Sequence, residues 1–451
     1  MASLQPMMDP SNILAQTTAP PPQVGQELMP PPPESIDETG LSRTSVEQLI
    51  LKTLYRRGEV VGREISQSLG LKFSVVDELM ETFKRQQIVQ VRKSLGMGNM
   101  SAYFSLSESG RNLAGQFLAI NQYVGPAPVP LSHYTVLVRR QKQSPGWLTP
   151  KDLKHAYRRM VVTPQILSQI GPAVSSGNSF LIYGEPGNGK TYLAEALADL
   201  DRSPIYMPYA LEHQGNVIQL YDPTYHQVIE DEGSLSQIAF ELPYDGRWFK
   251  TRRPFIVTGG ELTLDMLDLS YNEITRIYDA PFQLKANNGI YLIDDFGRQR
   301  VSPAEVLNRW IVPMERRVDY LSLRSGGKMT VPFEAFLVFS TNLQPSSLGD
   351  EAFLRRIQYK MRMPNPSREE FQTIFQRFCE AREIQCPAEV VEQFIAKHYR
   401  EGKRAMRRCH PRDVISHALD IIHFEKLDEA LTTQVLDRAF ESCFIDESLG
   451  S

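Results

Sequence analysis

The chain has 451 residues, of which 41% are hydrophobic and 23% charged, and its formal net charge is −4 at pH 7. This length fits two or three domains of a soluble globular protein, and the near balance of charge excludes bulk electrostatics as a reason to bind nucleic acid or membrane. No apolar run approaches the roughly 20 residues that a membrane span needs, and the first residues lack the basic and apolar regions of a secretion signal, so we expect a cytoplasmic protein.

Residues 1–42 form a Pro-rich segment with the runs APPP and MPPPPE, and they carry acids but no Lys or Arg. Such a segment buries too little apolar surface to offset the entropy of ordering it. The composition therefore predicts a disordered acidic tail. The alternative is a docking arm that binds a partner as a polyproline helix.

Residues 43–123 predict three helices followed by two strands around a Gly-rich tip. The first helix starts at TSVEQLILK, where Thr44 and Glu47 have the spacing of a capping box. This order of elements resembles a winged helix-turn-helix domain.

A winged helix binds DNA or protein, and the fold does not decide between them. The first turns of the helix that would read DNA contain Asp77, Glu78 and Glu81, which phosphates repel. We therefore favour protein docking or oligomerisation, and DNA binding stays open.

Residues 124–150 contain repeated Pro and a basic cluster, which indicates a partly extended linker. Strands alternate with helices over residues 151–362, a pattern typical of a parallel α/β core. Residues 363–451 are helical throughout and end in a tail. The cysteines there show no metal-ligand spacing, and we expect reduced thiols; they are Cys379, Cys386, Cys409 and Cys443.

The stretch GEPGNGKT has the G-x-x-x-x-G-K-T pattern and lies between an apolar strand and an amphipathic helix. Its backbone N–H groups and the helix N-terminus attract phosphates. Lys190 is expected to reach the β and γ phosphates of ATP, and Thr191 to bind Mg²⁺. The predicted nucleotide-binding residues are Gly184, Glu185, Pro186, Gly187, Asn188, Gly189, Lys190, Thr191 and Tyr192.

The stretch GIYLIDDF is an apolar strand that ends in two acids. Asp294 is the expected partner of Mg²⁺, and Asp295 lies where a base would polarise the attacking water. An Asp carboxylate stands about 1.5 Å further back than that of Glu, and a displacement near 1 Å can lower a rate about 10²-fold. We therefore expect slow or partner-stimulated hydrolysis; the alternative is that both acids only solvate the strand end.

Together with these motifs, the stretches FEAFLVFSTNLQP, LGDEAFLRRIQYKM and RRCHPRDVISHALDII make residues 151–446 resemble an AAA+ ATPase. The resemblance implies that Asn342 orients the lytic water and that Arg412 points from the lid to the nucleotide. It further implies that Arg356, with Arg355 in reserve, enters the site of a neighbouring subunit. The alternative for Arg355 and Arg356 is a surface Arg pair in a solvated loop. The alternative for Arg412 is a solvated basic face.

The segment YRRMVVTPQIL before the phosphate loop resembles the part of the family that packs on adenine. Val162, with Val161 and Ile166, is the candidate for the base pocket, and ordinary core packing is the alternative.

The stretch DYLSLRSGGKMTVP reads as a β-hairpin turned at residues 325–327. A hairpin before the Asn342 strand resembles the branch of metal chelatases, MoxR-type chaperones and enhancer-binding activators, in which it can face the central pore of the ring. No Gly-Ala-Phe-Thr-Gly-Ala loop is present, and the Asp-Asp ending instead resembles replication initiators and loaders. The leading hypothesis is thus a bacterial-type ATPase ring that remodels a partner recruited by residues 43–123. The alternative is a DNA-binding regulator or loader in which ATP switches assembly.

Residues 201–288 exceed what a minimal core needs. They contain Lys250, Arg252 and Arg253 near two aromatics, a cluster that fits single-stranded nucleic acid or a solvated strand flanked by core aromatics. We expect His226 at the surface.

Overall fold

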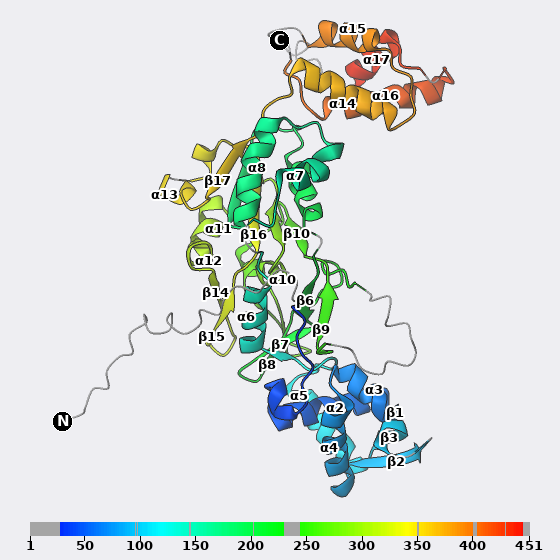
Figure 1. Cartoon of the computed structure of the whole chain (residues 1–451), viewed down its shortest axis with the longest axis vertical. Coiled ribbons are helices and arrows are strands. Elements are labelled where there is room, and N and C mark those ends of the chain that lie inside the picture. Colours follow the sequence, from blue (N-terminus) through cyan, green and yellow to red (C-terminus); the bar gives the residue numbers. More distant parts are fainter. Residues whose placement is uncertain are drawn as a thin grey trace, which may run out of the picture.

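The computed structural model describes residues 28–444 except 95, 97, 144–145, 202, 230–243, 350, 400–403 and 429. Figure 1 shows an elongated molecule, with an N-terminal module at one end, an α/β core in the middle and a helical lid at the other end. Within the described residues, each helix is too short or too polar to cross a lipid bilayer.

The N-terminal module has the predicted three helices and hairpin, and a further short strand and helix complete it. The antiparallel sheet has the order β1-β3-β2, and apolar side chains of all three helices share one core with Phe104 and Leu106 of the sheet. The first helix is capped by Ser42, whose side chain accepts from the Ser45 N–H, so the predicted Thr44–Glu47 capping box is wrong. The elements are α2 (Arg43–Arg57), β1 (Val60–Val61), α3 (Gly62–Leu69), α4 (Phe73–Arg85), β2 (Val89–Ser94), β3 (Ala102–Leu106) and α5 (Glu108–Ile120).

Residues 28–42 are folded, so the predicted disorder is wrong for this part; residues 1–27 lie outside the described residues. The short helix α1 (Ile36–Thr39) ends at Gly40, and Leu41 is buried in the core of the N-terminal module. The carbonyl of Pro30 accepts a hydrogen bond from the N–H of Asp245 in the central part. This segment therefore connects the two parts.

The prediction of a partly extended linker is wrong for much of residues 124–150. Strand β4 (Val129–Pro130) and helix α6 (Leu131–Arg140) lie there, and Tyr134 and Val138 of α6 are buried. The hydroxyl of Tyr134 accepts a hydrogen bond from Asn287 Nδ2 at 2.9 Å. The two residues lie far apart in the sequence, so a local sequence pattern cannot predict this contact.

The core is a five-stranded parallel sheet with the order β10-β13-β16-β5-β17. The helices α7, α8 and α9 pack on one face with Phe180 and Val338, and α11 packs on the other with Leu181 and Phe339. All five carboxyl ends meet at one edge, where ligands of open α/β sheets bind. The elements are β5 (Ser179–Tyr183), β10 (Phe255–Thr258), β13 (Ile290–Ile293), β16 (Phe336–Thr341), β17 (Tyr359–Arg362), α7 (Pro150–Ala156), α8 (Pro164–Ser176), α9 (Lys190–Glu195), α11 (Pro303–Arg309), α12 (Ile311–Arg316) and α13 (Glu351–Leu354).

A second sheet of order β11-β12-β8-β7-β4 lies between the core and the N-terminal module (Figure 1). The predicted hairpin is confirmed: its two strands pair antiparallel around the turn at Gly326, whose φ is +85°. Leu321 and Met329 bury one hairpin face against the second sheet, so only the other face is exposed. The elements are β6 (Ile205–Pro208), β7 (Ala210–His213), β8 (Asn216–Gln219), β9 (Trp248–Thr251), β11 (Ser270–Asn272), β12 (Ile277–Asp279), α10 (Phe282–Lys285), β14 (Val318–Ser322) and β15 (Lys328–Pro332).

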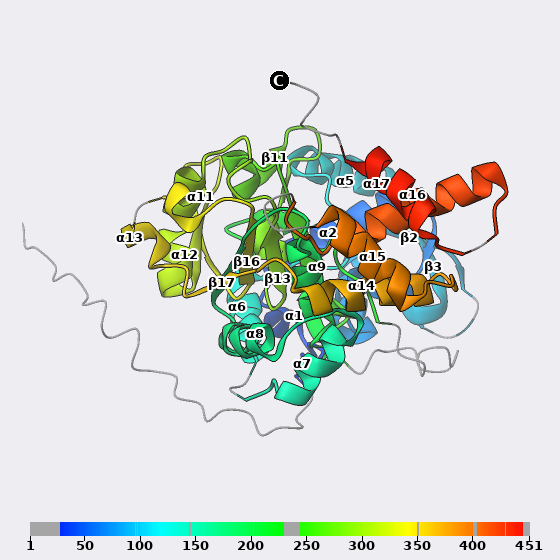
Figure 2. The same cartoon turned by 90° about the horizontal axis from the view of Figure 1, so that it is seen from above.

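The lid is a bundle of four helices with its own apolar core. Seen from the lid end in Figure 2, these helices lie to one side of the core, away from α11, α12 and α13. All four cysteines are free thiols and lie in the lid. Its elements are α14 (Arg368–Glu380), α15 (Ala388–His398), α16 (His410–Glu425) and α17 (Thr433–Cys443).

Candidate nucleotide site

The phosphate loop connects β5 to α9, and two of its glycines are required by their surroundings. Gly184 has a φ of +141°, and a Cβ there would lie 2.5 Å from the Met363 carbonyl oxygen. Gly187 has a φ of +77°, and a Cβ would lie 2.6 Å from Cys409 Sγ. The loop thus needs glycine both for its turns and for the close approach of its neighbours.

The Lys190 ammonium lies at the centre of the loop. Its Nζ donates to the carbonyl oxygens of Gly184 and Glu185, each at 3.0 Å, and to Asn342 Oδ1 at 2.6 Å. Burial lowers the pKa of Lys190, and the charges of Asp295 and Asp294 oppose that shift. The carboxyl ends of β5 and β16 therefore hold this side chain together.

The two acids of the β13 strand end lie beside this ammonium and take different partners. The Thr191 hydroxyl lies 2.9 and 3.1 Å from the two carboxylate oxygens of Asp294. Asp295 turns the chain with a φ of +49°, and its Oδ1 accepts from Asn342 Nδ2 at 2.8 Å. A hydroxyl and a carboxylate are hard oxygen ligands that suit Mg²⁺, which usually takes one or two protein groups besides phosphates and water.

A cleft of about 700 Å³ lies between the core and the lid. Sites for small-molecule ligands have volumes of roughly 300–1,000 Å³, so the cleft is large enough for such a ligand. Met160, Val161, Ile374 and Phe378 give one end apolar walls. Val162 does not line the cleft but packs against the core. The predicted residues that line it are Val161, Pro186, Gly187, Asn188, Gly189, Lys190, Thr191, Tyr192, Asp294, Asp295, Asn342 and Arg412.

The lid contacts the phosphate loop through the basic segment before α16, of which the sequence analysis predicted only Arg412 as a nucleotide-site residue. Arg407 donates to Glu185 Oε2 at 2.8 Å, and the Cys409 N–H donates to the Gly187 carbonyl at 2.8 Å. Arg412, the predicted lid arginine, lies at the cleft but is 58% exposed and pairs with Asp413. The basic composition of this segment indicates that it could face the nucleotide, but the spacing of its arginines does not show which of them is buried.

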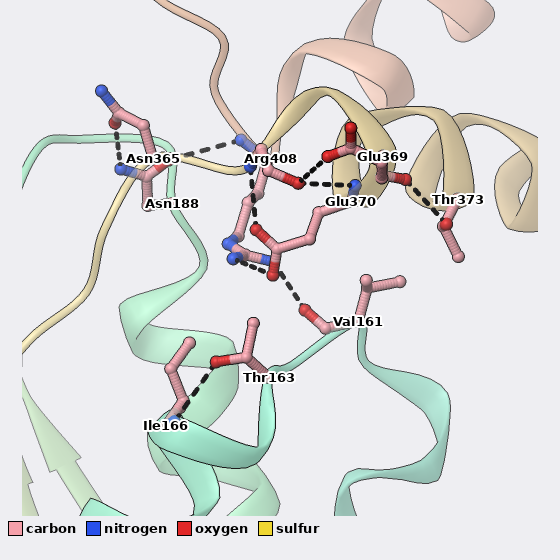
Figure 3. Close-up of polar contacts among 10 residues, drawn as sticks. Val161, Thr163, Ile166, Asn188, Asn365, Glu369, Glu370, Thr373 and Arg408 are labelled. Atoms are coloured by element: carbon pink, nitrogen blue, oxygen red, sulfur yellow. Dashed lines mark hydrogen bonds and ion pairs between the residues drawn. The ribbon is translucent and has the colours of Figure 1, made fainter.

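Arg408 is the most deeply buried arginine of this run, and Figure 3 shows its contacts. Its guanidinium donates to the Val161 carbonyl at 2.5 Å and to Glu370 Oε1 at 2.9 Å. Its backbone N–H donates to Asn188 Oδ1 at 3.4 Å, and Asn188 Nδ2 donates to Asn365 Oδ1 at 2.7 Å. One residue thus joins the lid, the phosphate loop and the segment before α8.

Neither candidate finger arginine lines this chain's own cleft. Arg356 is partly buried and its Nε donates to Glu315 Oε1 at 2.9 Å, whereas Arg355 is exposed.

Two further predictions concern the inserted region. Arg253 pairs with Asp201 and donates to the carbonyls of Asn288 and Gln141, so it is a structural part of the core rather than a free cation. His226 is 1% exposed, and the expected surface position is wrong. The turn that begins at Asp222 folds its ring inward, where Nδ1 accepts from the Asp222 N–H and Nε2 contacts the Lys285 carbonyl.

A family described as a domain of unknown function, DUF8689, matches residues 367–442, which is most of the lid. No curated protein matches the chain.

Two solved structures are similar over about two thirds of the chain. NtrX from Brucella abortus has a TM-score of 0.40 and 13% identity, over 65% of this chain and 58% of that one. The RuvB Holliday junction branch migration motor of Thermotoga maritima has a TM-score of 0.35 and 16% identity, over 66% of this chain and 71% of that one. The chain's own parallel sheet and the phosphate loop at its carboxyl edge give it an α/β fold with a P-loop NTPase core.

Proposed function

We propose that this chain is an AAA+ ATPase. It binds Mg-ATP between core and lid, assembles into a ring and uses hydrolysis to remodel a protein partner recruited by residues 43–123. The observation that carries the proposal is the Asn342 amide, whose oxygen accepts from Lys190 at 2.6 Å and whose nitrogen donates to Asp295 at 2.8 Å. One polar side chain thus contacts both the phosphate-binding lysine and the acid that would polarise water.

The residues have separate roles. Thr191 and Asp294 would hold Mg²⁺, which neutralises phosphate charge when bound. Lys190 binds the phosphates, and Asp295 accepts a hydrogen bond from the attacking water. Asn342 fixes the carboxylate of Asp295 from the side. Because an Asp carboxylate stands further back than that of Glu, we expect turnover to be slow.

The arginine that completes the site comes from a neighbouring copy. Arg355 is exposed, whereas Arg356 must first leave Glu315. A guanidinium contributed in trans stabilises charge on the γ-phosphate and is worth about 10³–10⁵ in rate in other P-loop enzymes.

A mixing experiment tests the composite site. Lys190→Ala subunits lack a working phosphate loop but keep their arginines, and Arg356→Ala subunits have the reverse defect. Each alone should be inactive, and a mixture should recover part of the ATP hydrolysis. The same test with Arg355→Ala identifies the finger, and Arg316→Ala, an exposed arginine on α12, is the control.

Two outcomes would contradict the proposal. If Arg355→Ala and Arg356→Ala both hydrolyse ATP like the wild type, the trans arginine is refuted. If the wild type binds ATP but shows no turnover at any protein concentration, ATP is a structural or switching ligand.

The recruitment role rests on the surface of the N-terminal module. The acids of α4 stay exposed or half-buried, and Glu78 pairs with Arg43 at 2.7 Å. Val91 and Met100 of the wing are 46% and 41% exposed. An acidic helix beside exposed apolar side chains suits a protein better than DNA phosphates.

A second candidate function, DNA binding with ATP as an assembly switch, is supported by α7 and the turn after it. Lys151, Lys154, His155 and Arg158 are exposed at helical spacings of three and four residues, which places them on one face. The buried Leu153 and Tyr157 occupy the opposite face.

Fluorescence anisotropy with duplex and single-stranded DNA tests this candidate. Binding that falls steeply with salt and is lost in the Lys151→Glu, Lys154→Glu double variant supports it. Binding that instead needs residues 43–123 assigns DNA to the winged module, and no binding at low salt refutes the candidate.

A further inference from the structure

We propose that Gln299 is a positioning residue for ATP hydrolysis: it holds the turn after β13 and thereby sets the direction of the Asp295 carboxylate. This inference rests on the proposed function and adds to it a residue that does not line the cleft. Neither the phosphate-loop pattern nor the pair of acids assigns this role to Gln299.

The first observation is the shape of the turn that carries the second acid. Asp295 and Gly297 have φ angles of +49° and +104°. A residue with a side chain rarely adopts a positive φ, although Asp tolerates it better than most. The Arg298 N–H closes the turn by donating to the Asp295 carbonyl at 2.9 Å. Since such a conformation persists only where its surroundings hold it, the contacts of the turn decide where the carboxylate lies.

The second observation is that Gln299 supplies two of these contacts. Its Nε2 donates to the Asp294 carbonyl oxygen at 2.9 Å, and its Oε1 accepts from the Gly297 N–H at 2.7 Å. The two bonds therefore reach the chain on both sides of Asp295. One end of the side chain faces a carbonyl and the other an N–H, so only a group that both donates and accepts satisfies both.

The third observation is what holds the rest of the turn. The Asp294 N–H donates to the Thr258 carbonyl of β10 at 2.8 Å, and the Phe296 N–H donates to the Ser340 carbonyl of β16 at 2.7 Å. These bonds fix the two ends of the segment to neighbouring strands. Within the described residues, the hydrogen bond to the carbonyl between the two acids comes from Gln299. Gln299 therefore controls the peptide group that orients Asp295.

This arrangement separates catalysis from binding. Lys190 and Thr191 are carried by the phosphate loop and the start of α9, and Asp294 stays tied to β10. Loss of the Gln299 bonds should therefore displace Asp295 and leave the phosphate-binding groups in place. A displacement near 1 Å can lower a rate about 10²-fold.

The first test compares kcat and the Kd for ATP in the full chain. Gln299→Met keeps the length of the side chain and removes both hydrogen bonds. We expect kcat to fall about 10–100-fold while the Kd for ATP changes little. Asn308→Ala, which removes an exposed amide on α11, is the control and should keep the kcat of the wild type.

The second test uses Gln299→Glu and pH. A protonated carboxyl group donates through its O–H and accepts through its other oxygen, as the amide does, whereas the ionised group cannot donate. The ratio of kcat between Gln299→Glu and the wild type should therefore rise as the pH falls from 8 to 5.5, by up to about tenfold per pH unit. At the lower pH this variant should exceed Gln299→Met, whose ratio should not change with pH.

Three outcomes overturn the inference: a wild-type kcat in Gln299→Met, an equal loss of kcat and ATP affinity in that variant, or a ratio for Gln299→Glu that does not change with pH. Relief of charge repulsion alone would bring Gln299→Glu only to the level of Gln299→Met, so that result also contradicts the role of the donor. If the wild type hydrolyses no ATP, the proposed function fails and this inference fails with it. If the wild type is active, a failure concerns Gln299 alone.

Discussion

Replacing Asp245 alone by Leu should loosen the N-terminal module from the core. Asp245 and Arg247 form an ion pair at 2.8 Å with side chains 4% and 2% exposed. Arg247 also donates to the Thr39 carbonyl at 2.8 Å, and the Asp245 N–H donates to the Pro30 carbonyl at 2.8 Å. The pair thus holds the folded segment before α2 against the start of β9.

The magnitude follows from the burial of both charges. Removing one partner of a buried pair leaves an uncompensated charge and costs about 3–5 kcal/mol, whereas replacing both by apolar residues of similar volume is often neutral. The Asp245→Leu, Arg247→Met double variant also loses the hydrogen bond to Thr39, worth about 1 kcal/mol. The single variant should therefore open the contact more than the double variant by at least about 2 kcal/mol, which is more than tenfold in the equilibrium.

Hydrogen exchange of residues 30–42 measures this opening. Exchange should rise strongly in Asp245→Leu and only slightly in the double variant. Glu34→Gln, which breaks the more exposed Lys72–Glu34 pair of the same segment, should change it little. If the double variant exchanges as fast as the single one, the buried pair contributes no more than ordinary packing and the reasoning is refuted.

Three further predictions concern single residues. Burial lowers the pKa of Lys52 from 10.5 to about 8, so the unfolded chain binds more protons between these values and stability rises with pH across this window. Lys52→Met should raise the stability of the module at pH 7, by less than the roughly 3 kcal/mol of the pKa shift, because the hydrogen bond from Lys52 Nζ to Asn121 Oδ1 is lost. It should also flatten the dependence of the melting temperature on pH between 8 and 10.5. Asn342→Asp replaces the donor to Asp295 by a like charge, so kcat for ATP should fall about 10²–10³-fold while the Kd for ATP changes little. Gly187→Ala should weaken ATP binding, because a left-handed φ costs about 1–2 kcal/mol and the new Cβ meets Cys409, and adding Cys409→Ala should recover part of the affinity in the same titration.

The phosphate loop, the acid pair and the hairpin could be predicted because their chemistry is local. The motif from Gly184 to Thr191 is recognised from consecutive residues, and the hairpin strands are joined by a short Gly turn. The Asp294 and Asn342 strand ends could also be brought together, since parallel strands end at one sheet edge.

What the sequence missed depends on contacts between distant segments. Helix α6 lies in a Pro-rich stretch that resembles a linker, and it folds because Tyr134 and Gln141 find partners at Asn287 and Tyr206. Arg408 looks no different in sequence from its neighbours. Its inward direction is set by Glu370, on another helix.

The shortened acid at position 295 is best understood with Lys190 and Asn342 as one unit. The ammonium of a lysine has three N–H donors, and all three are engaged, by Gly184, Glu185 and Asn342. A phosphate can therefore bind Lys190 only by replacing one of these acceptors. If the Asn342 oxygen is replaced, it becomes free to accept from a water molecule, while its nitrogen still holds Asp295. Under the proposed function, nucleotide binding would thus free the Asn342 oxygen for a water molecule while the Asn342 nitrogen keeps its hydrogen bond to Asp295.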